Sequence, residues 1–521
     1  MDISQLIKTK RDGDQATSRP LHILFATSEV APFSKTGGLG DVAASLPAAL
    51  AARGHHVNII TPLYGHIDPE EYHLSRRLRV VEVPRKGLRQ NKLTTTIWEG
   101  HLRGGVRVFF VENEKFFGRD GLYGYDGDSF EDNAARFSFF SRAIIEFVLA
   151  NDVPVDIIHC NDWHTALAPV YAAHYYEDDF LDRAFVFTIH NLAHQGVFSD
   201  EQFDATGLPR GKFFNGGDIR GENGEGINFL RAGLLYSDHV TTVSPTHANE
   251  IQTEDGSFGL TKTLQGCQDI LSGILNGADY SVWSPSVDQK IEVRYDVSSL
   301  NNKRRNKATL QHRFNLPVRP TLPLLGFIGR LAEQKGLDIL IPALRKLLKQ
   351  FESEREGFQV VFLGEGDKSY ERRLQALQRD FPKRVSVHVG YEEEIAHQIQ
   401  AGTDLLLVPS KFEPCGLTQI YALRYGTLPL VHATGGLADT VIDADDARGT
   451  KGTGFTFGTF DEESLIEAIE RATSSYKNYR RWRPLMINAM AQDFSWNESA
   501  KSYEEIYIDT LYEPLDGEEE E

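Results

Sequence analysis

The sequence predicts an α/β protein made of two doubly wound, parallel-sheet domains. At 521 residues the chain is too long for one hydrophobic core and has the length of two domains. Short apolar runs that end in small polar residues alternate with amphipathic stretches, which is typical of parallel strands joined by helices. A polar, strand-poor stretch, residues 280–320, interrupts this alternation, and the pattern then restarts.

The first domain is expected to open with a βαβ unit. LHILFATSEV, residues 21–30, has the apolar character of a buried strand, and a glycine-rich loop follows it. A helix comes next and is closed by Gly54, and HVNIITP, residues 56–62, forms the next strand after a right-handed crossover. Further strands, with a helix over 133–151 among them, are expected at 106–112, 155–162, 184–191 and 239–245.

The second series begins with a strand at 323–331 and an amphipathic helix at 336–351. Its later strands are expected at 358–366, 385–391, 403–410 and 427–433. We therefore predict domains over residues 1–278 and 279–496, with a final helix, about 497–521, packing back on the first domain. Ligands of doubly wound sheets bind at the carboxyl ends of the strands, so facing domains would hold the site in the cleft between them.

Charge and cysteine content narrow the possible partners and compartments. The net charge of −19 disfavours binding to nucleic acid or to an anionic membrane, because both need clustered Lys and Arg. The three cysteines are widely spaced and odd in number, which suggests neither a disulfide framework nor a metal site. With no secretory signal and no run of about 20 apolar residues, the chain is expected to be cytoplasmic and free of the membrane.

Two similar glycine loops stand out, SKTGGLG at residues 34–40 and ATGGLADTV at 433–441. The first is not a P-loop, because Lys35 precedes the glycines, and its G-G-x-G spacing differs from the dinucleotide fingerprint. The amide groups at a helix N-terminus bind anions, and glycine lets a ligand approach them. A glycine pair can equally serve only to make a tight strand–helix turn, and both interpretations remain open here.

Polar side chains follow the predicted strands at the points where ligands of such sheets bind. Arg330 and Lys335, between a strand and a helix start, suit a diphosphate, although a solvated loop is the alternative. Glu413 can accept hydrogen bonds from sugar hydroxyls or simply favour a helix N-terminus. The full set at strand ends is Lys35, Asp162, His190, Asn191, Arg330, Lys335 and Glu413.

No metal site is predicted. His190 and His194 are four residues apart, but HNLAH lacks the glutamate of H-E-x-x-H. No other cluster completes a site around His159, Asp162 and His164.

Together these segments resemble the signatures of bacterial glycogen synthases and plant starch synthases, which are retaining glycosyltransferases of the GT-B fold. The likeness extends in order from about residue 21 to residue 512. It rests on KTGGLGDV, HCNDWHTAL, TIHNLAHQG, ILNGADYSVWSP, IGRLAEQKGLD, VPSKFEPCGLTQIYALRYGTLPLVHATGGLADTV and DFSW. The resemblance implies transfer of glucose from ADP-glucose to the non-reducing 4-hydroxyl of an α-1,4-glucan, without a metal or cofactor and with an oligomeric state left open.

The resemblance also implies roles for individual residues. Asp162 and His190 approach the glucose, Arg330 and Lys335 hold the diphosphate and stabilise the leaving ADP, and Glu413 contacts the donor glucose. Lys35 helps to bind the sugar nucleotide, Tyr391 lies near the adenine, and the second glycine loop offers amides to the distal phosphate. The complete substrate-binding set implied is Lys35, Gly37, Gly38, Asn276, Tyr391, Cys415, Gly416, Leu417, Thr418, Thr434, Gly435 and Gly436.

One position departs from many related retaining enzymes, which carry a second glutamate eight residues after the first. Here that position is Tyr421, a difference that glycogen and starch synthases share. Other possibilities are a GT-B enzyme that uses UDP-glucose or glucose 1-phosphate, a sucrose-forming transferase, and a non-catalytic glucan-binding protein. An NAD oxidoreductase is disfavoured, because no acidic residue ends the second strand. Retention by same-face attack and by a covalent intermediate both remain possible.

Overall fold

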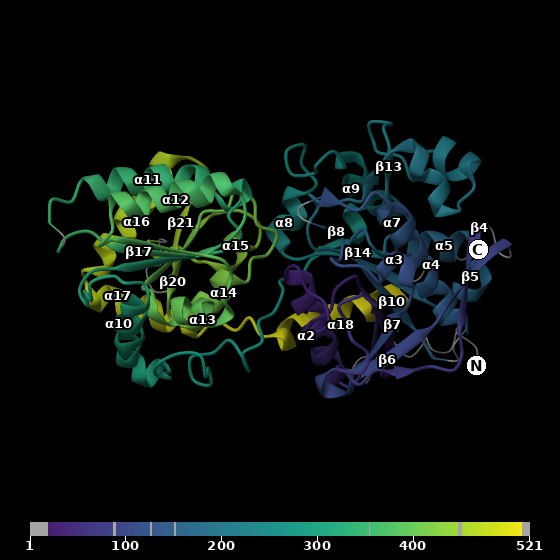
Figure 1. Cartoon of the computed structure of the whole chain (residues 1–521), viewed down its shortest axis with the longest axis horizontal. Helices are drawn as coiled ribbons and strands as arrows, with labels where there is room; N and C mark the ends of the chain where they lie inside the picture. The colour runs from purple at the N-terminus through teal and green to yellow at the C-terminus, as the bar shows by residue number, and fades with distance from the viewer. Residues whose placement is uncertain are drawn as a thin grey trace, which may run out of the picture. The chain divides into compact units, whose positions relative to one another are not determined.

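A computed structural model describes residues 19–86, 90–125, 128–150, 153–353, 355–445 and 451–512 (Figure 1). The chain divides into two compact units. Unit 1 comprises Met1–Val243, Ala248–Gly277 and Trp496–Glu521, and unit 2 comprises Ser244–His247 and Ala278–Ser495. The sequence places its domain boundaries after residues 278 and 496. The part of the predicted final helix beyond residue 512 lies outside the described residues.

Unit 1 is built on a nine-stranded sheet in the order β15-β14-β11-β10-β1-β2-β7-β6-β3. The seven strands from β15 to β7 are parallel, and the chain order reverses between β1 and β10. The strands are β1 His22–Ala26, β2 His56–Pro62, β3 Ser75–Arg76, β6 Ile97–His101, β7 Arg107–Val111, β10 Ile157–Asn161, β11 Ala184–Ile189, β14 His239–Thr242 and β15 Leu271–Gly273.

The unit 1 sheet departs from the predicted parallel arrangement at one edge. Strand β6 pairs antiparallel with β7, and β3 pairs antiparallel with β6. Two adjacent glycines, Gly104 and Gly105, both adopt φ 80° in the connection and allow the chain to double back. Three two-stranded sheets add to this unit: β4 Val81–Lys86 with β5 Gln90–Thr95, β8 Gly124–Tyr125 with β9 Asp128–Ser129, and β12 Val197–Phe198 with β13 Ile227–Asn228.

Helices cover both faces of the unit 1 sheet. The C-terminal helix α18, Trp496–Tyr512, packs on α2, Gly38–Ala52, and the yellow α18 lies beside the purple α2 in Figure 1. On that face the Tyr507 hydroxyl lies 2.7 Å from Nδ1 of the buried His159 in β10. The main remaining helices are α4 Asn133–Ala150, α5 Leu167–Tyr175 and α7 Phe229–Leu235, with shorter turns at α3 Glu114–Phe117, α6 Glu177–Phe180 and α9 Thr261–Gly266.

Unit 2 contains a six-stranded, wholly parallel sheet in the order β18-β17-β16-β19-β20-β21. Numbered along the chain this is 3-2-1-4-5-6, the order of a dinucleotide-binding sheet, with its switch point between β16 and β19. The predicted fold class of two doubly wound domains is therefore confirmed. The strands are β16 Leu324–Ile328, β17 Gln359–Gly364, β18 Val385–Val389, β19 Leu405–Val408, β20 Leu428–His432 and β21 Phe455–Phe457.

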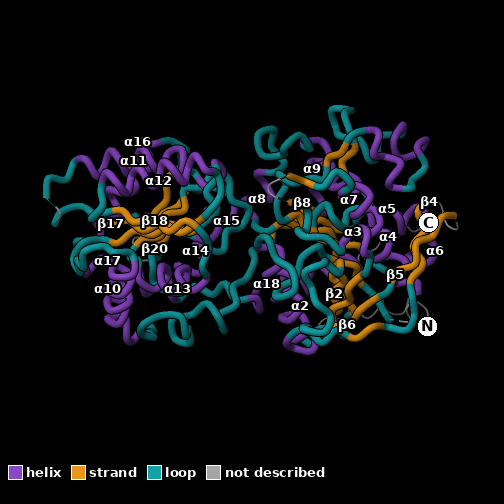
Figure 2. Tube along the Cα trace, in the orientation of Figure 1, coloured by secondary structure: helices purple, strands orange, loops and turns teal. Residues whose placement is uncertain are grey.

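The helices of unit 2 form one layer on each side of its sheet, as the orange strands between purple helices show (Figure 2). One layer contains α11 Leu337–Lys349, α12 Lys368–Asp380 and α16 Glu462–Tyr476. The other contains α10 Lys303–Arg313, α13 Glu393–Gly402, α14 Thr418–Arg424 and α17 Tyr479–Met490. Helix α10 lies within the polar, strand-poor stretch of residues 280–320, for which no helix was predicted.

Four residues from the first half of the chain, Ser244–His247, belong to unit 2. They lie where the chain enters the short helix α8, Pro245–Glu250. The Ser244 hydroxyl donates to the carbonyl of Pro414 at 2.7 Å, and the amide and hydroxyl of Thr246 donate to Asp439 at 2.9 and 2.7 Å. These bonds attach the segment to the loop after β19 and to α15, Gly435–Thr440.

Candidate active site

In each unit the residues implicated by the sequence cluster where the chain order of the sheet reverses. Strands β1 and β10 are neighbours in unit 1, and the first glycine loop follows β1 while Asp162 follows β10. Strands β16 and β19 are neighbours in unit 2, and Arg330 follows β16 while Glu413 follows β19. Crevices of this kind are the usual ligand sites of open parallel sheets.

Asp162 is held in an unusual backbone conformation at the end of β10. Its φ is 55°, and its amide donates to the carbonyl of Thr188 at 3.0 Å. The carboxylate accepts the amide hydrogen of His190 at 2.8 Å, which ties the ends of β10 and β11 together. The side chain is almost fully buried, and this burial raises the pKa of Asp162 to about 7.

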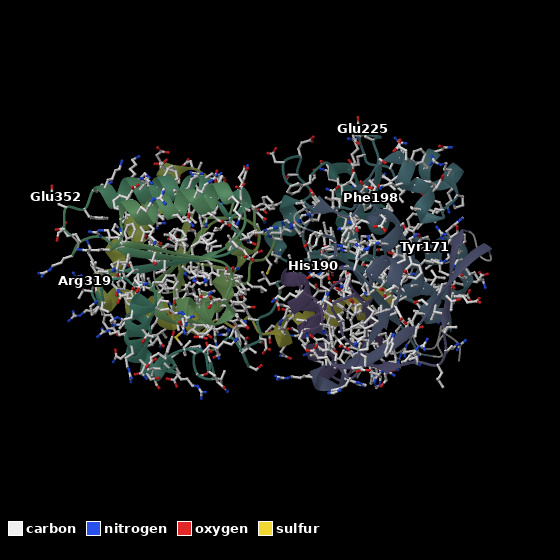
Figure 3. All side chains as sticks on the ribbon, in the orientation of Figure 1. Tyr171, His190, Phe198, Glu225, Arg319 and Glu352 are labelled. Carbon is white, nitrogen blue, oxygen red and sulfur yellow. The ribbon has the colours of Figure 1, made fainter. Side chains whose placement is uncertain are left out.

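His190, labelled among the side chains of unit 1 in Figure 3, is a neutral hydrogen-bonding group. Its Nε2 lies 2.8 Å from Oδ1 of Asn161, whose amide nitrogen donates to the carbonyls of Ala26 and His159. Because Oδ1 can only accept, Nε2 of His190 carries the hydrogen and Nδ1 keeps a lone pair. Burial removes water from around the ring and lowers the pKa of His190 to about 3. The ring is therefore neutral and suits an acceptor role better than a cationic one.

The first glycine loop is open toward solvent. A Cβ atom added at Gly37 or Gly38 would have no neighbour within 4 Å, and neither glycine has a positive φ. Neither packing nor backbone conformation therefore requires glycine at these two positions, which favours the interpretation that a ligand approaches here. Lys35, before the glycines, is exposed and lies 2.7 Å from Asp41.

One residue of this loop region was missed by the sequence analysis. Glu29, just after β1, is 3% exposed, and its carboxylate accepts hydrogen bonds from Thr36, Gly37 and Tyr123. The available signal was a charged residue at the end of an apolar run, in TSEV.

Asn276 lies beyond β15, near the end of the second stretch of unit 1. Its side chain is 7% exposed, and its Oδ1 has no hydrogen-bond partner among the described residues. A buried amide oxygen without a partner is costly, so this atom is a natural acceptor for a ligand hydroxyl.

Unit 2 pairs a cation with a carboxylate. The Nζ of Lys335 lies 2.6 Å from Oε2 of Glu413, and the Ser410 hydroxyl donates to the same oxygen at 2.9 Å. Arg330 is exposed and donates to the side chain of Gln334 at 3.2 Å. The structure thus brings Lys335 and Glu413 into contact and leaves the Arg330 guanidinium at the surface of this unit.

At the second glycine loop, close packing within the protein requires glycine. A Cβ at Gly435, whose φ is 45°, would lie 2.1 Å from the carbonyl oxygen of Glu413, and one at Gly436 would lie 2.3 Å from that of Cys415. The amide of Gly436 donates to the carbonyls of Glu413 and Pro414. The amide of Leu437 donates within its own turn. These two amides donate to protein carbonyls, and the glycines allow the two loops to pack closely.

The remaining predicted residues of unit 2 differ in accessibility. Cys415 is buried, and Gly416 adopts φ 74°. Leu417 and Thr418 are half-buried at the start of α14, and Tyr391 is 57% exposed. Thr434 is buried immediately before α15.

An aromatic stack occupies the position where many related enzymes carry a second glutamate. The ring of Tyr421 is stacked on Trp283 with centroids 4.2 Å apart and an interplanar angle of 5°. The ring of Trp283 is also stacked on that of His397, with centroids 3.7 Å apart. Of the two positions that carry glutamates in many related enzymes, 413 and 421, only 413 carries a carboxylate in this chain.

Among the described residues, no group of three or more His, Cys, Asp or Glu side chains is arranged to hold a metal ion. Within the same residues, no helix has both the length and the hydropathy needed to cross a membrane.

Comparisons with known proteins cover nearly the whole chain. A family model for the starch synthase catalytic domain matches residues 22–266, and a model for glycosyl transferases group 1 matches residues 309–485. A glycogen synthase of Anaeromyxobacter is 44% identical over 94% of this chain and 99% of its own length. Glycogen synthase 2 of Nitrosococcus oceani is 46% identical over 93% of this chain and 96% of its own length.

Solved structures show the same relationship. The catalytic domain of starch synthase IV from Arabidopsis thaliana, bound to ADP and acarbose, is 36% identical, with a TM-score of 0.85 over 94% of this chain and 99% of that one. A sucrose-phosphate synthase from Thermosynechococcus elongatus, 18% identical with a TM-score of 0.57 over 94% of this chain and 98% of that one, shares the fold alone.

Proposed function

Because this chain belongs to the glycogen and starch synthase family, we propose that it transfers glucose from ADP-glucose to the non-reducing 4-hydroxyl of an α-1,4-glucan, with retention of configuration. The chain is a glycosyltransferase, so the family and enzyme class predicted from its motifs are confirmed. The observation that carries the proposal within the structure is the contact of Lys335 with Glu413 at the switch point of the second sheet. This contact supports the proposal because a cation that suits a diphosphate lies beside a carboxylate that can accept sugar hydroxyls.

We assign the leaving group to Arg330 and Lys335. When the bond between glucose and the diphosphate breaks, negative charge builds on the diphosphate and positive charge on the sugar. Cations fixed in advance lower the barrier, because they need no reorganisation as the charge develops. The exposed Arg330 bonds to the neutral side chain of Gln334 and can fork onto phosphate oxygens, whereas Lys335 is already oriented by Glu413.

We assign sugar binding to carboxylates and to neutral hydrogen-bond acceptors. Glu413 can offer its second oxygen to hydroxyls, because the bonds from Lys335 and Ser410 both go to its Oε2. The lone pair of neutral His190 and the unpartnered Oδ1 of Asn276 can accept further sugar hydroxyls. Asp162, with a pKa of about 7, either donates or accepts near neutral pH.

We further propose that the reaction needs no divalent metal and that the protein works in the cytoplasm. Arg330 and Lys335 provide the positive charge that a metal would otherwise bring to the diphosphate. The three cysteines are free and buried, which suits a reducing compartment. If EDTA abolished activity in a buffer without added metal, the metal-free scheme would be wrong.

The decisive experiment is a rate comparison of ADP-glucose, UDP-glucose and glucose 1-phosphate, each with glycogen as the acceptor. We expect ADP-glucose to give the highest kcat/KM. A preference for UDP-glucose would assign a different donor, and turnover with glucose 1-phosphate alone would indicate a phosphorylase. Glucan binding without turnover of any donor would indicate a non-catalytic homologue.

A further inference from the structure

Glu29 makes an unusually complete set of hydrogen bonds to the first glycine loop. Its Oε2 accepts the amide hydrogens of Thr36 at 2.7 Å and Gly37 at 3.3 Å. Its Oε1 accepts the hydroxyl hydrogens of Thr36 at 2.6 Å and Tyr123 at 2.7 Å. Hydrogen bonds to a carboxylate are roughly twice as strong as neutral ones, so this group is a strong anchor.

The middle of the loop has few other means of staying in place. Thr36, Gly37 and Gly38 are exposed, and the two glycines offer no side chain to pack. Glycine also loses more conformational freedom on ordering than any other residue. The flanks are better held, since the amide and carbonyl of Val30 bond to Ser34, and the amide of Ala31 donates to the carbonyl of Gly40. The carboxylate of Glu29 therefore bridges the part of the loop between two fixed ends.

Lys35 directly precedes the amides that Glu29 holds. Helix α2 begins at Gly38, so the orientation of its first turn depends on the same peptide groups. A buried carboxylate beside a helix N-terminus is also favoured by the helix dipole. The hydrogen bonds of Glu29 to Thr36 and Gly37 therefore fix the orientation of the Lys35 backbone and of the first turn of α2.

We propose that Glu29 is a positioning residue for the transfer reaction, which orders the loop Lys35–Gly38 before substrate binds. This inference rests on the proposed function for the reaction itself, but the ordering of the loop is measurable without turnover. Glu29 acts through the loop peptide groups and not by contact with the sugar. Tyr123 extends the anchor, because its hydroxyl also lies 2.7 Å from Oγ of Ser28.

The test is hydrogen exchange of the full-length protein, with Glu29→Ala and Glu29→Gln. We expect the amides of Thr36 and Gly37 to exchange about tenfold faster or more in Glu29→Ala, because their acceptor is gone. The glutamine variant should recover much of this protection, since its oxygen still accepts from both amides and its NH₂ can donate to the hydroxyls of Thr36 and Tyr123.

A matched control is Glu222, whose carboxylate also accepts two backbone amides of unit 1, those of Lys262 and Thr263. Glu222→Ala should speed exchange at α9 and leave residues 34–40 unchanged. In steady-state assays Glu29→Ala should lower kcat/KM for ADP-glucose by about tenfold or more, and Glu29→Gln should lie between it and the wild type.

Three outcomes would overturn the proposal. The first is unchanged exchange at residues 34–40 in Glu29→Ala, even if activity is lost, because Glu29 would then act by touching substrate. The second is faster exchange over the whole of unit 1, which would indicate a general loss of stability. The third is faster loop exchange with unchanged kcat/KM in an active enzyme. If the wild type transfers glucose from no donor, the proposed function fails while the exchange result still decides whether Glu29 orders the loop.

Discussion

Lys335 and Glu413 are 2.6 Å apart, so the loss of either side chain disturbs the other, and a single substitution cannot say which of them acts on substrate. Lys335→Ala leaves the carboxylate of Glu413, whose side chain is 11% exposed, with the hydroxyl of Ser410. Leaving a buried charged group poorly satisfied costs about 1–3 kcal/mol in the free energy of unfolding. The same substitution removes a cation from the proposed diphosphate site, which should lower kcat by about 10²–10³-fold, or about 3–4 kcal/mol in the barrier.

A double-mutant cycle with Glu413→Gln separates these two effects. Glutamine keeps an acceptor for Ser410 and removes the charge that Lys335 balances, so Lys335→Ala should destabilise the Glu413→Gln variant much less than the wild type. If Lys335 acts on the diphosphate, its removal should still lower kcat by a similar factor in that variant. Chemical denaturation gives the stabilities, and ADP release with glycogen as acceptor gives the rates. A kinetic effect of Lys335→Ala that disappears in the Glu413→Gln variant would refute a direct role and leave Lys335 as a support for Glu413.

The other predictions concern the glycine loops, pH and the C-terminal helix. Gly38→Ala should keep the melting temperature of the wild type, because a Cβ at this position meets no other atom of the protein. It should raise KM for the donor, because the added methyl group would occupy the space through which the ligand is proposed to approach. Gly435→Ala should lower the melting temperature sharply, because its Cβ would lie 2.1 Å from a carbonyl oxygen and φ is positive. Folded Asp162 stays protonated to about pH 7 whereas the unfolded chain ionises near 3.8, so its contribution to stability falls as pH rises through this window. Asparagine does not titrate, so this loss should be absent in Asp162→Asn. Between about pH 5 and about pH 8 the free energy of unfolding of the wild type should fall by about 2–3 kcal/mol more than that of Asp162→Asn, measured by urea unfolding. Tyr507→Phe should cost about 1–3 kcal/mol in the free energy of unfolding, measured in the same way, because it removes a partner of the buried His159 ring.

Strands of the two parallel sheets were the easiest elements to predict, because they are buried on both faces and read as continuous apolar runs. The run at residues 56–62 coincides with β2, and those at 184–191 and 427–433 contain β11 and β20. Strands β15 and β21 were missed, because each has three residues and lies at a sheet edge. Such short segments carry too little periodicity to stand out from loops.

Helix α10 was missed because its core-facing side chains include charged ones. Lys303 and Lys307 are both buried, and their amines bond to polar groups of unit 2. Lys303 reaches the carbonyl of Ala401 at 2.9 Å, and Lys307 reaches the carboxylate of Asp404 at 2.6 Å. A hydropathy pattern assigns lysine to the solvent-exposed face, so the buried face of this helix does not stand out as an apolar stripe in the sequence. The placement of Ser244–His247 in unit 2 likewise depends on hydrogen bonds that leave no periodic signal.

The two glycine loops show why similar sequences need not serve one purpose. At Gly435 and Gly436 an added Cβ would collide with the loop that contains Glu413 and Cys415, so glycine is required there by packing within the protein. A Cβ at Gly37 or Gly38 would meet no protein atom, and the carboxylate of Glu29 holds the loop through the amides of Thr36 and Gly37. Sequence alone left the tight-turn and ligand interpretations open for both. The structure favours the tight-turn interpretation for the second loop, where protein atoms fill the space beside the glycines. It favours the ligand interpretation for the first loop, where the space beside Gly37 and Gly38 contains no protein atoms.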